Sequence, residues 1–102
     1  MTDRILTPQQ ELYLLKCNEY YKIGITGNIR SRLNSLRTGN PYKIELLLSV
    51  PMKYAEVVEE RLHDGLKEYK HFREWFKLDE IDEYFVHDLK QFLISLSNYE
   101  KA

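Results

Sequence analysis

A lysine and a glycine stand inside a stretch that otherwise reads as a buried strand, YYKIGIT at residues 20–26. Neither Lys22 nor Gly24 favours a sheet, because a buried ammonium loses its hydration and glycine has no side chain to pack. Glycine does let another group approach the backbone closely, and a neighbouring lysine supplies positive charge. A glycine inside a strand also marks a β-bulge, so Gly24 alone leaves open whether this part of the sheet is a local irregularity or a surface that a phosphate or a water molecule approaches.

Two further polar residues lie at the edges of apolar helical stripes. At ~100° per residue, Glu59 falls about 20° from Leu66 on a helical wheel, whereas Glu60 lies nearly opposite the stripe. On an earlier helix, Arg32 flanks the apolar stripe beside Leu36. A half-buried arginine and a half-buried carboxylate on different helices can form a salt bridge, or they can act together on a ligand.

A tight turn must join the strands that position the lysine. Aromatic and β-branched residues cluster in two runs of strand length on either side of Asn18-Glu19, which predicts a β-hairpin. A two-residue turn places Tyr13 opposite Gly24, and directly opposed residues share a face of the sheet. Tyr13, Lys22 and Gly24 are therefore expected on one face.

The remaining elements predict an α/β (α+β) domain in which a three-stranded antiparallel sheet is flanked by helices. The expected order is β-β-α-β-α, then a short aromatic segment, then a final helix. The expected ranges are a helix from the N-cap Asn28 to Gly39, a strand at 44–50 covered on both faces, a helix at 53–70, and a helix at 80–98 with Asp79 as its N-cap.

The chain has 102 residues, a length that builds one core. We expect residues 1–10 to form a flexible arm and residues 79–102 to form a helix packed on the same domain as the rest. The single cysteine, Cys17, excludes an intramolecular disulfide and a multi-cysteine metal site. No apolar run approaches the roughly 20 residues that span a bilayer, and the N-terminus lacks the apolar core of a secretory signal. These features predict a soluble cytoplasmic protein.

Charge is unevenly distributed along the chain. The formal net charge is −1, but residues 1–43 contain seven Lys/Arg and three Asp/Glu. This half has a net charge of +4, and the remainder has −5. Such asymmetry lets one face approach a phosphate backbone while the bulk of the molecule stays acidic, although charges also fall wherever solvent is.

Several segments in order resemble one family of nucleases. LYLLKC, YYKIGIT, NIRSRLNSLRTGNP, EVVEERLH and REWF together resemble the GIY-YIG nuclease superfamily, most closely its compact phage and bacterial branch. The resemblance covers residues 11–78 and implies a GIY-YIG-like nuclease domain there. It places the first tyrosine at Tyr13, the glycine at Gly24, the catalytic arginine at Arg32 and the metal-binding glutamate at Glu59. Lys22 replaces the second tyrosine of the family.

The resemblance implies a DNA endonuclease that depends on Mg²⁺ or Mn²⁺ and hydrolyses phosphodiester bonds. Glu59 would hold the metal, which needs few protein carboxylates because Mg²⁺ keeps several waters. Arg32 would stabilise the charge on the phosphate. Tyr13 or Lys22 would act on the attacking water, and Lys22 is alternatively a phosphate ligand. A second departure from the family is Leu36, which replaces a histidine found in many members.

Other residues are candidates for contact with DNA rather than for chemistry. Trp75 and Phe76 either stack on a base or belong to the core. Two alternatives to an enzyme remain open: a non-catalytic DNA-binding module that keeps the fold, and a structural domain in which Arg32 and Glu59 pair with each other. A homodimer or a partner protein would supply specificity. The expected DNA and phosphate contacts are Gly24, Arg30, Arg37, Tyr20 and His63.

Overall fold

The structure is a computed structural model and describes residues 10–101. Residues 1–9 of the expected arm lie outside this range, and Gln10 already belongs to a strand. The elements in chain order are β1 (Gln10–Cys17), β2 (Tyr20–Thr26), α1 (Ile29–Arg37), β3 (Glu45–Met52), α2 (Ala55–Gly65), the 3-10 turn η2 (Lys67–Tyr69), β4 (Lys70–Phe72), β5 (Trp75–Phe76), the 3-10 turn η3 (Leu78–Glu80) and α3 (Phe85–Lys101).

The α+β class and the antiparallel sheet are confirmed, but the predicted number of strands is wrong. The sheet has five strands in the order β3-β1-β2-β5-β4 rather than three. The additional strands come from the short aromatic segment, which folds into a hairpin and pairs Phe76 with Tyr21 and Trp75 with Lys22. Strand β5 has only two residues, so it is too short for an alternating pattern to reveal it.

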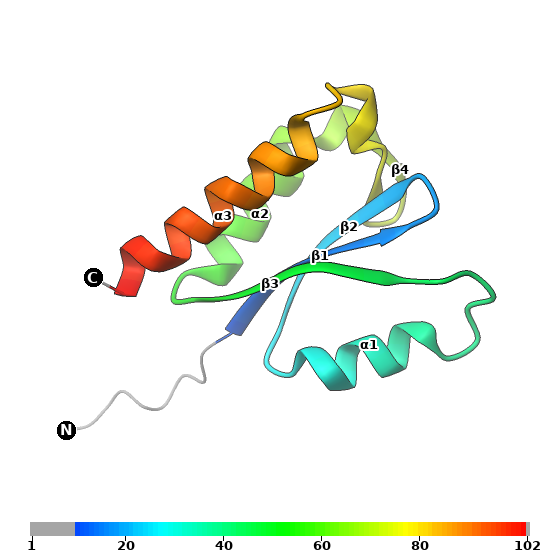
Figure 1. Cartoon of the computed structure of the whole chain (residues 1–102), viewed down its shortest axis with the longest axis horizontal. Helices are drawn as coiled ribbons and strands as arrows, with labels where there is room; N and C mark the ends of the chain where they lie inside the picture. Colours follow the sequence, from blue (N-terminus) through cyan, green and yellow to red (C-terminus); the bar gives the residue numbers. More distant parts are fainter. Residues whose placement is uncertain (1–9, 102) are drawn as a thin grey trace.

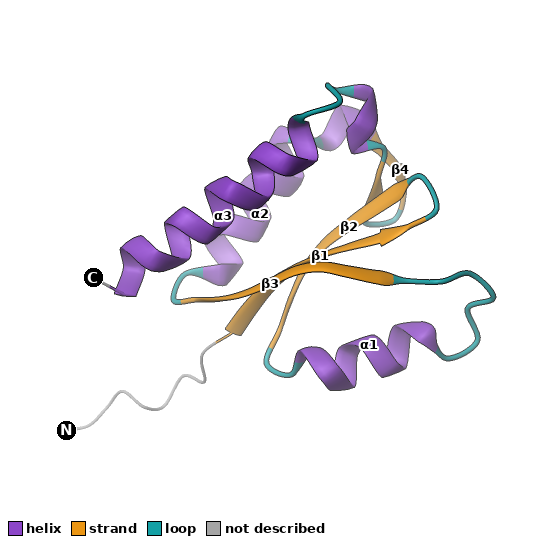
Figure 2. Ribbon diagram, viewed as in Figure 1, coloured by secondary structure: helices purple, strands orange, loops and turns teal. Residues whose placement is uncertain are grey.

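Helices cover both faces of the sheet, and each face has its own hydrophobic core. Helix α1 lies against one face, whereas α2 and α3 lie together against the other (Figures 1 and 2). The core under α1 contains Tyr13, Leu15, Cys17, Leu33 and Ile44. The larger core under α2 and α3 contains Leu12, Leu14, Tyr21, Ile23, Met52, Ala55, Leu66, Phe76, Leu78, Leu89 and Leu93. Alternation along β1 therefore separates the two cores.

Strand β3 lies at the edge of the sheet and is only partly covered, contrary to the expectation of a strand buried on both faces. The pairing with β1 shifts between Leu14 and Leu15, which makes Leu47 an extra residue on β3. Because of this bulge, the consecutive residues Leu47 and Leu48 both pack against the larger core. Pro51 continues the strand instead of closing it, since an edge strand tolerates a missing N–H.

The structure confirms the predicted start and end of α1 and corrects the later helices. Asn28 caps α1 by accepting a hydrogen bond from the Ser31 N–H at 3.0 Å, and Gly39 has a φ of +78° just beyond its end. Helix α2 ends at Gly65 rather than near residue 70. Asp79 is not an N-cap of α3; it lies in η3 and accepts a hydrogen bond from the Tyr21 hydroxyl at 3.1 Å.

Within residues 10–101, no helix combines the length and the apolar character that crossing a membrane requires.

Candidate functional site

The β1–β2 hairpin places three of the expected site residues on one face. Its observed register pairs Tyr13 with Gly24 and Leu15 with Lys22, as the two-residue turn predicts. Asn18 occupies the turn with a φ of +56°, a left-handed conformation that asparagine tolerates. Because Tyr13 and Leu15 belong to the core under α1, Lys22 faces the same side of the sheet.

Gly24 makes room for a tyrosine ring rather than for an incoming phosphate. A Cβ built on Gly24 would collide with the hydroxyl end of the Tyr13 side chain, far inside van der Waals contact. The expectation that a phosphate or water approaches the backbone at Gly24 is therefore wrong in this structure, because the Tyr13 phenol already fills that space. The glycine sets the position of the Tyr13 hydroxyl.

The Tyr13 hydroxyl in turn holds Arg32. The Arg32 Nε donates a hydrogen bond to the Tyr13 hydroxyl at 3.2 Å, and this bond is the main cause that raises the pKa of the guanidinium. Tyr13 is only 1% exposed, so its ring is a fixed support. The bond uses the Nε of Arg32, and the two terminal nitrogens of the guanidinium are therefore the groups left to meet an anion.

A lysine and a glutamate form the second pair of the site. The Lys22 Nζ donates to the Glu74 carboxylate at 2.8 Å, and the Lys22 side chain is 8% exposed whereas that of Glu74 is 50% exposed. This hydrogen bond is the main cause that lowers the pKa of Glu74. The Lys22 Nζ also lies 5.7 Å from the centre of the Trp75 ring. The solvent-facing member of this pair is therefore the Glu74 carboxylate, and Lys22 lies beneath it.

Strand β2 has an open edge next to Lys22. Strand β5 pairs with Tyr21 and Lys22 only, so beyond these two residues no strand from the described part of the chain pairs with β2 on that side. His63 of α2 fills part of this gap, because its Nε2 lies 2.8 Å from the carbonyl oxygen of Ile23. A carbonyl can only accept, so Nε2 carries the proton. His63 therefore braces the edge of the sheet with this nitrogen, and its expected contact with DNA or a phosphate stays a prediction.

Glu59 reaches the same region from the other layer of the molecule. It lies on α2 one turn before His63 and is half-buried. Burial is the main cause that raises the pKa of Glu59, while the nearby charge of Glu74 also raises it and those of His63 and Lys22 lower it. Beyond the end of β5, the Glu59 carboxylate of α2 therefore lies close enough to Lys22 to feel its charge, although Lys22 faces α1 on the other side of the sheet.

Arg32 and Glu59 do not pair directly. The ion pairs among residues 10–101 join Lys22 to Glu74, Lys67 to Asp64 and Lys77 to Glu19. Arg32 and Glu59 instead share a neighbour, because the charge of Glu74 influences the pKa of each of them. The interpretation of Arg32 and Glu59 as a salt bridge is therefore wrong for the described residues.

Glu74 belongs to the site but was not among the residues expected there. It occupies the two-residue turn between β4 and β5, next to Arg73, whose φ is +53°. The segment REWF was interpreted through its aromatic residues alone. The available signal was a charged residue two positions before the buried Phe76, because the turn had to bring it to the edge of the sheet.

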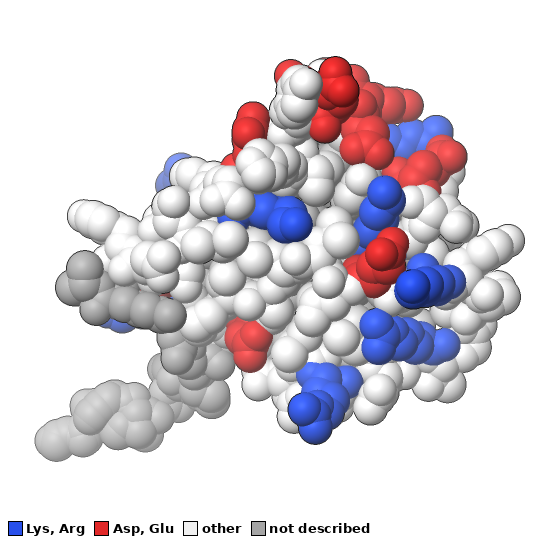
Figure 3. All heavy atoms as spheres, viewed as in Figure 1, with Lys and Arg blue, Asp and Glu red and all other residues white. Residues whose placement is uncertain are grey.

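Basic residues concentrate on one side of the molecule. Figure 3 shows Lys and Arg side chains gathered over α1 and its loop to β3, whereas acidic side chains gather where η3 leads to α3. No acidic residue lies between Glu19 and Glu45, a segment with five Lys/Arg. Arg30 is exposed there, and Arg37 donates to the Ile44 carbonyl at 2.9 Å. Arg37 therefore braces the loop as well as adding charge.

No group of three or more His, Cys, Asp or Glu side chains among residues 10–101 is arranged to hold a metal. The chemistry of the donors nevertheless fits a hard cation at one place. Glu59 is a half-buried carboxylate with a second carboxylate, Glu74, near enough to raise its pKa. Mg²⁺ binds through one or two carboxylates and keeps several waters, and its charge would relieve this repulsion.

The fold and the site together define a small α+β domain that gathers two cations and two carboxylates at one sheet edge. The family model of the T5orf172 domain matches residues 10–96. The chain therefore belongs to the T5orf172 domain family. Searches of curated proteins and of solved structures returned no significant match.

Proposed function

We propose that this protein is a metal-dependent DNA endonuclease with a site of the GIY-YIG type. The observation that carries the proposal is the clustering of Arg32, Lys22, Glu74 and Glu59 around the open edge of β2. A structural role does not require a buried lysine and a half-buried glutamate from opposite layers at one edge, since both carry a desolvation cost.

The cations of the site would bind the scissile phosphate. Arg32 would present its two terminal nitrogens to two phosphate oxygens, while Tyr13 holds the guanidinium in place through Nε. Lys22 would donate to a phosphate oxygen in place of Glu74. The basic side chains over α1 would attract the DNA backbone, and this attraction should weaken as salt rises.

Glu59 would hold the metal through its half-buried carboxylate. When bound, Mg²⁺ or Mn²⁺ would supply Lewis-acid stabilisation of charge at the phosphate and at the leaving oxygen. The charge of a metal at Glu59 would also offset the repulsion from the nearby Glu74 carboxylate, which stays free of the metal.

In the hydrolytic step, the oxygen of a water molecule attacks the phosphorus, and the bond from phosphorus to the 3′ oxygen breaks. The water gives one proton to a base, and the 3′ oxygen takes a proton from solvent, which leaves a 5′ phosphate and a 3′ hydroxyl. Glu74 is our candidate for the base, because binding of the phosphate to Lys22 removes the main cause that lowers the pKa of Glu74. Tyr13 is nearly inaccessible and instead positions Arg32.

A non-catalytic DNA-binding module is the second candidate. The observation in its favour is that Lys22 and Glu74 already satisfy each other at 2.8 Å, so a phosphate can be recognised only if this pair opens. A binding module would use the basic face over α1 and leave the acidic residues without a catalytic role.

The deciding experiment is incubation with plasmid DNA and with single-stranded DNA, with and without Mg²⁺ or Mn²⁺. The wild type should cut only with metal, Glu59→Ala should not cut, and Glu60→Ala, an exposed neighbour on α2, should cut like the wild type. Binding of DNA without cleavage in any metal would leave the binding module as the function.

A further inference from the structure

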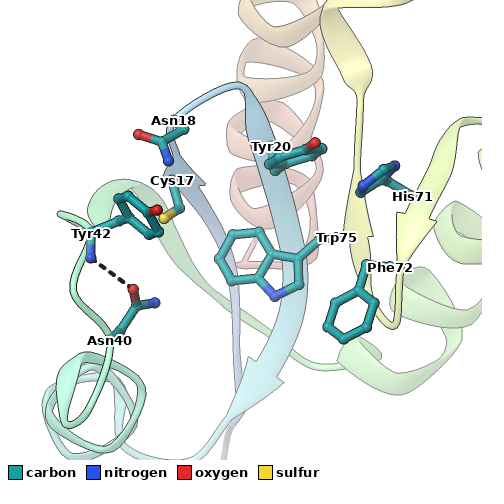
Figure 4. A pocket seen from close by; sticks show the side chains of 8 residues that line it. All are labelled: Cys17, Asn18, Tyr20, Asn40, Tyr42, His71, Phe72 and Trp75. Carbon is teal, nitrogen blue, oxygen red and sulfur yellow. Dashed lines mark hydrogen bonds between the residues drawn. The ribbon is translucent and has the colours of Figure 1, made fainter.

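An aromatic cavity lies beside the proposed site. Its volume is about 460 Å³, within the range of roughly 300–1,000 Å³ that is typical of small-molecule sites. Aromatic walls come from Tyr20, Trp75, Phe72 and Tyr42, and amide groups at the rim come from Asn18 and Asn40 (Figure 4). The cavity is therefore formed by the tip of the β1–β2 hairpin, the β4–β5 hairpin and the loop between α1 and β3.

The chemistry of the walls suits a flat, uncharged ligand. Among residues 10–101, no Asp, Glu, Lys or Arg lines the cavity. Tyr42 and Phe72 are 59% and 58% exposed, so their rings are open to an incoming ligand. Tyr20 already stacks on His71, with ring centres 4.7 Å apart and planes at 21°. The pocket thus presents ring faces held in place by their neighbours, which favours stacking with a planar ligand.

An amide group at the rim of the cavity can also form a hydrogen bond with the edge of such a ligand. The Asn40 Oδ1 accepts the backbone N–H of Tyr42 at 2.9 Å, and this bond fixes which end of the amide is free. In Figure 4 the Asn40 nitrogen lies on the side that faces Trp75. An amide donor beside a stacking surface is the combination that recognises a heterocyclic base.

Trp75 connects this cavity to the phosphate-binding residues. It forms one wall of the cavity, and it also pairs with Lys22 across β2 and β5, with the Lys22 Nζ 5.7 Å from its ring. A nucleotide whose phosphate meets Lys22 would therefore have an aromatic pocket for its base within the same site. A base paired inside a duplex cannot use the pocket, since its faces are covered by stacking and its edge by its partner.

We propose that this cavity binds an unpaired nucleobase of the DNA strand, so that the preferred substrate contains single-stranded or extrahelical nucleotides next to the scissile phosphate. The inference rests on the proposed function only in assuming that Lys22 meets a DNA phosphate. It is tested by binding alone, without metal, so its failure is distinguishable from a failure of cleavage.

Trp75 is the single tryptophan of the chain, so its fluorescence reports directly on the cavity. The wild-type protein would be titrated in EDTA with a short single-stranded oligonucleotide, with the same strand in a duplex, and with a strand of equal length made of abasic sites. The single strand should quench Trp75 and bind at least several-fold more tightly than the other two. Equal quenching by the abasic strand, or an equal affinity for the duplex, would overturn the proposal.

Exposed residues of the cavity allow a variant test with little risk to folding. Tyr42→Ala and Phe72→Ala should each weaken binding of the single strand by roughly 5- to 100-fold, as expected for loss of a stacking partner, and leave duplex affinity unchanged. Tyr99→Ala is the matched control, because Tyr99 is 79% exposed on α3 and outside the cavity. Equal losses for single strand and duplex would contradict the proposal even if cleavage were observed. Base-dependent binding without cleavage would support nucleobase binding in this cavity and contradict the proposed nuclease activity.

Discussion

The Arg32 Nε donates a hydrogen bond to the Tyr13 hydroxyl at 3.2 Å, which ties helix α1 to strand β1 of the sheet. This bond leaves the terminal nitrogens of the guanidinium for a ligand and fixes the direction in which they point. The Tyr13 ring is itself held over Gly24, where no larger residue fits. Three residues that are far apart in sequence therefore act as one support for a single cation.

The first prediction concerns the two terminal nitrogens of the Arg32 guanidinium. Arg32→Lys keeps one positive charge but cannot meet two phosphate oxygens, so cleavage should fall about 100- to 1,000-fold while DNA affinity changes little. Arg30→Lys is the matched control, since Arg30 is an exposed arginine on the same helix, and its cleavage rate should be unchanged. Single-turnover cleavage and a binding titration on both variants make the comparison. If both substitutions changed the cleavage rate equally, Arg32 would have no special role in cleavage.

The second prediction concerns the space under the Tyr13 ring. Gly24→Ala should push the Tyr13 phenol away from its place and destabilise the fold by about 1–3 kcal/mol, the usual cost of overpacking. The melting temperature should fall by roughly 4 °C or more. Gly27→Ala adds the same methyl group where nothing lies within 4 Å, so its melting temperature should stay close to that of the wild type. An unchanged melting temperature for Gly24→Ala would show that Tyr13 is not fixed by the glycine.

The hairpin could be predicted from the sequence because a two-residue turn leaves few registers, and the observed pairing of Tyr13 with Gly24 follows from it. Strand β5 could not be predicted, because two residues are too few to show a periodic pattern. Its pairing with Lys22 also joins segments that are far apart in the sequence. The place of Glu59 at the edge of its helix stripe was visible on a helical wheel. The approach of Glu59 to Lys22 was not, because it depends on how early β5 ends and leaves the edge of β2 open.

The third prediction concerns the ionisation of Glu59. Its pKa is raised in the folded protein, mainly by burial, so folding disfavours the charged form. The charged carboxylate therefore costs stability above the folded pKa, and this cost disappears as the pH falls below the ordinary carboxyl value of 4.5. Glu59→Gln should raise the melting temperature by a few degrees at pH 7 and have no effect at acidic pH.

Glu60→Gln is the control for this experiment, because Glu60 is exposed and the same charge is removed. Mg²⁺ should raise the melting temperature of the wild type and of Glu60→Gln, but not that of Glu59→Gln, since a ligand that binds only the folded state stabilises it. A lower melting temperature for Glu59→Gln at pH 7 would instead indicate that the carboxylate has a cationic partner and a structural role.

The last prediction uses the unequal exposure of Lys22 and Glu74. Glu74→Gln keeps the shape and a hydrogen-bond acceptor but removes the charge that faces a buried ammonium. Hydrogen bonds to charged groups are worth more than neutral ones, but Glu74 is half-exposed and screened by solvent, so we expect a loss of about 1 kcal/mol. Because the pKa of Glu74 is lowered in the fold, its contribution is complete above the ordinary carboxyl pKa. It is lost as the pH falls through the folded value, so the wild type and the variant should converge at acidic pH.

The same substitution separates an enzyme from a binding module. A phosphate must displace Glu74 from Lys22, so Glu74→Gln should bind DNA more tightly than Glu68→Gln, a control that removes the same charge from an exposed position in η2. If Glu74 accepts the proton of the attacking water, the variant should also lose cleavage, since an amide cannot take that proton. Tighter binding with unchanged cleavage would exclude Glu74 as the base, because the competition for Lys22 would then be its whole role. Unchanged affinity would show that the DNA phosphate does not meet Lys22, and the site would have to be sought elsewhere on the basic face.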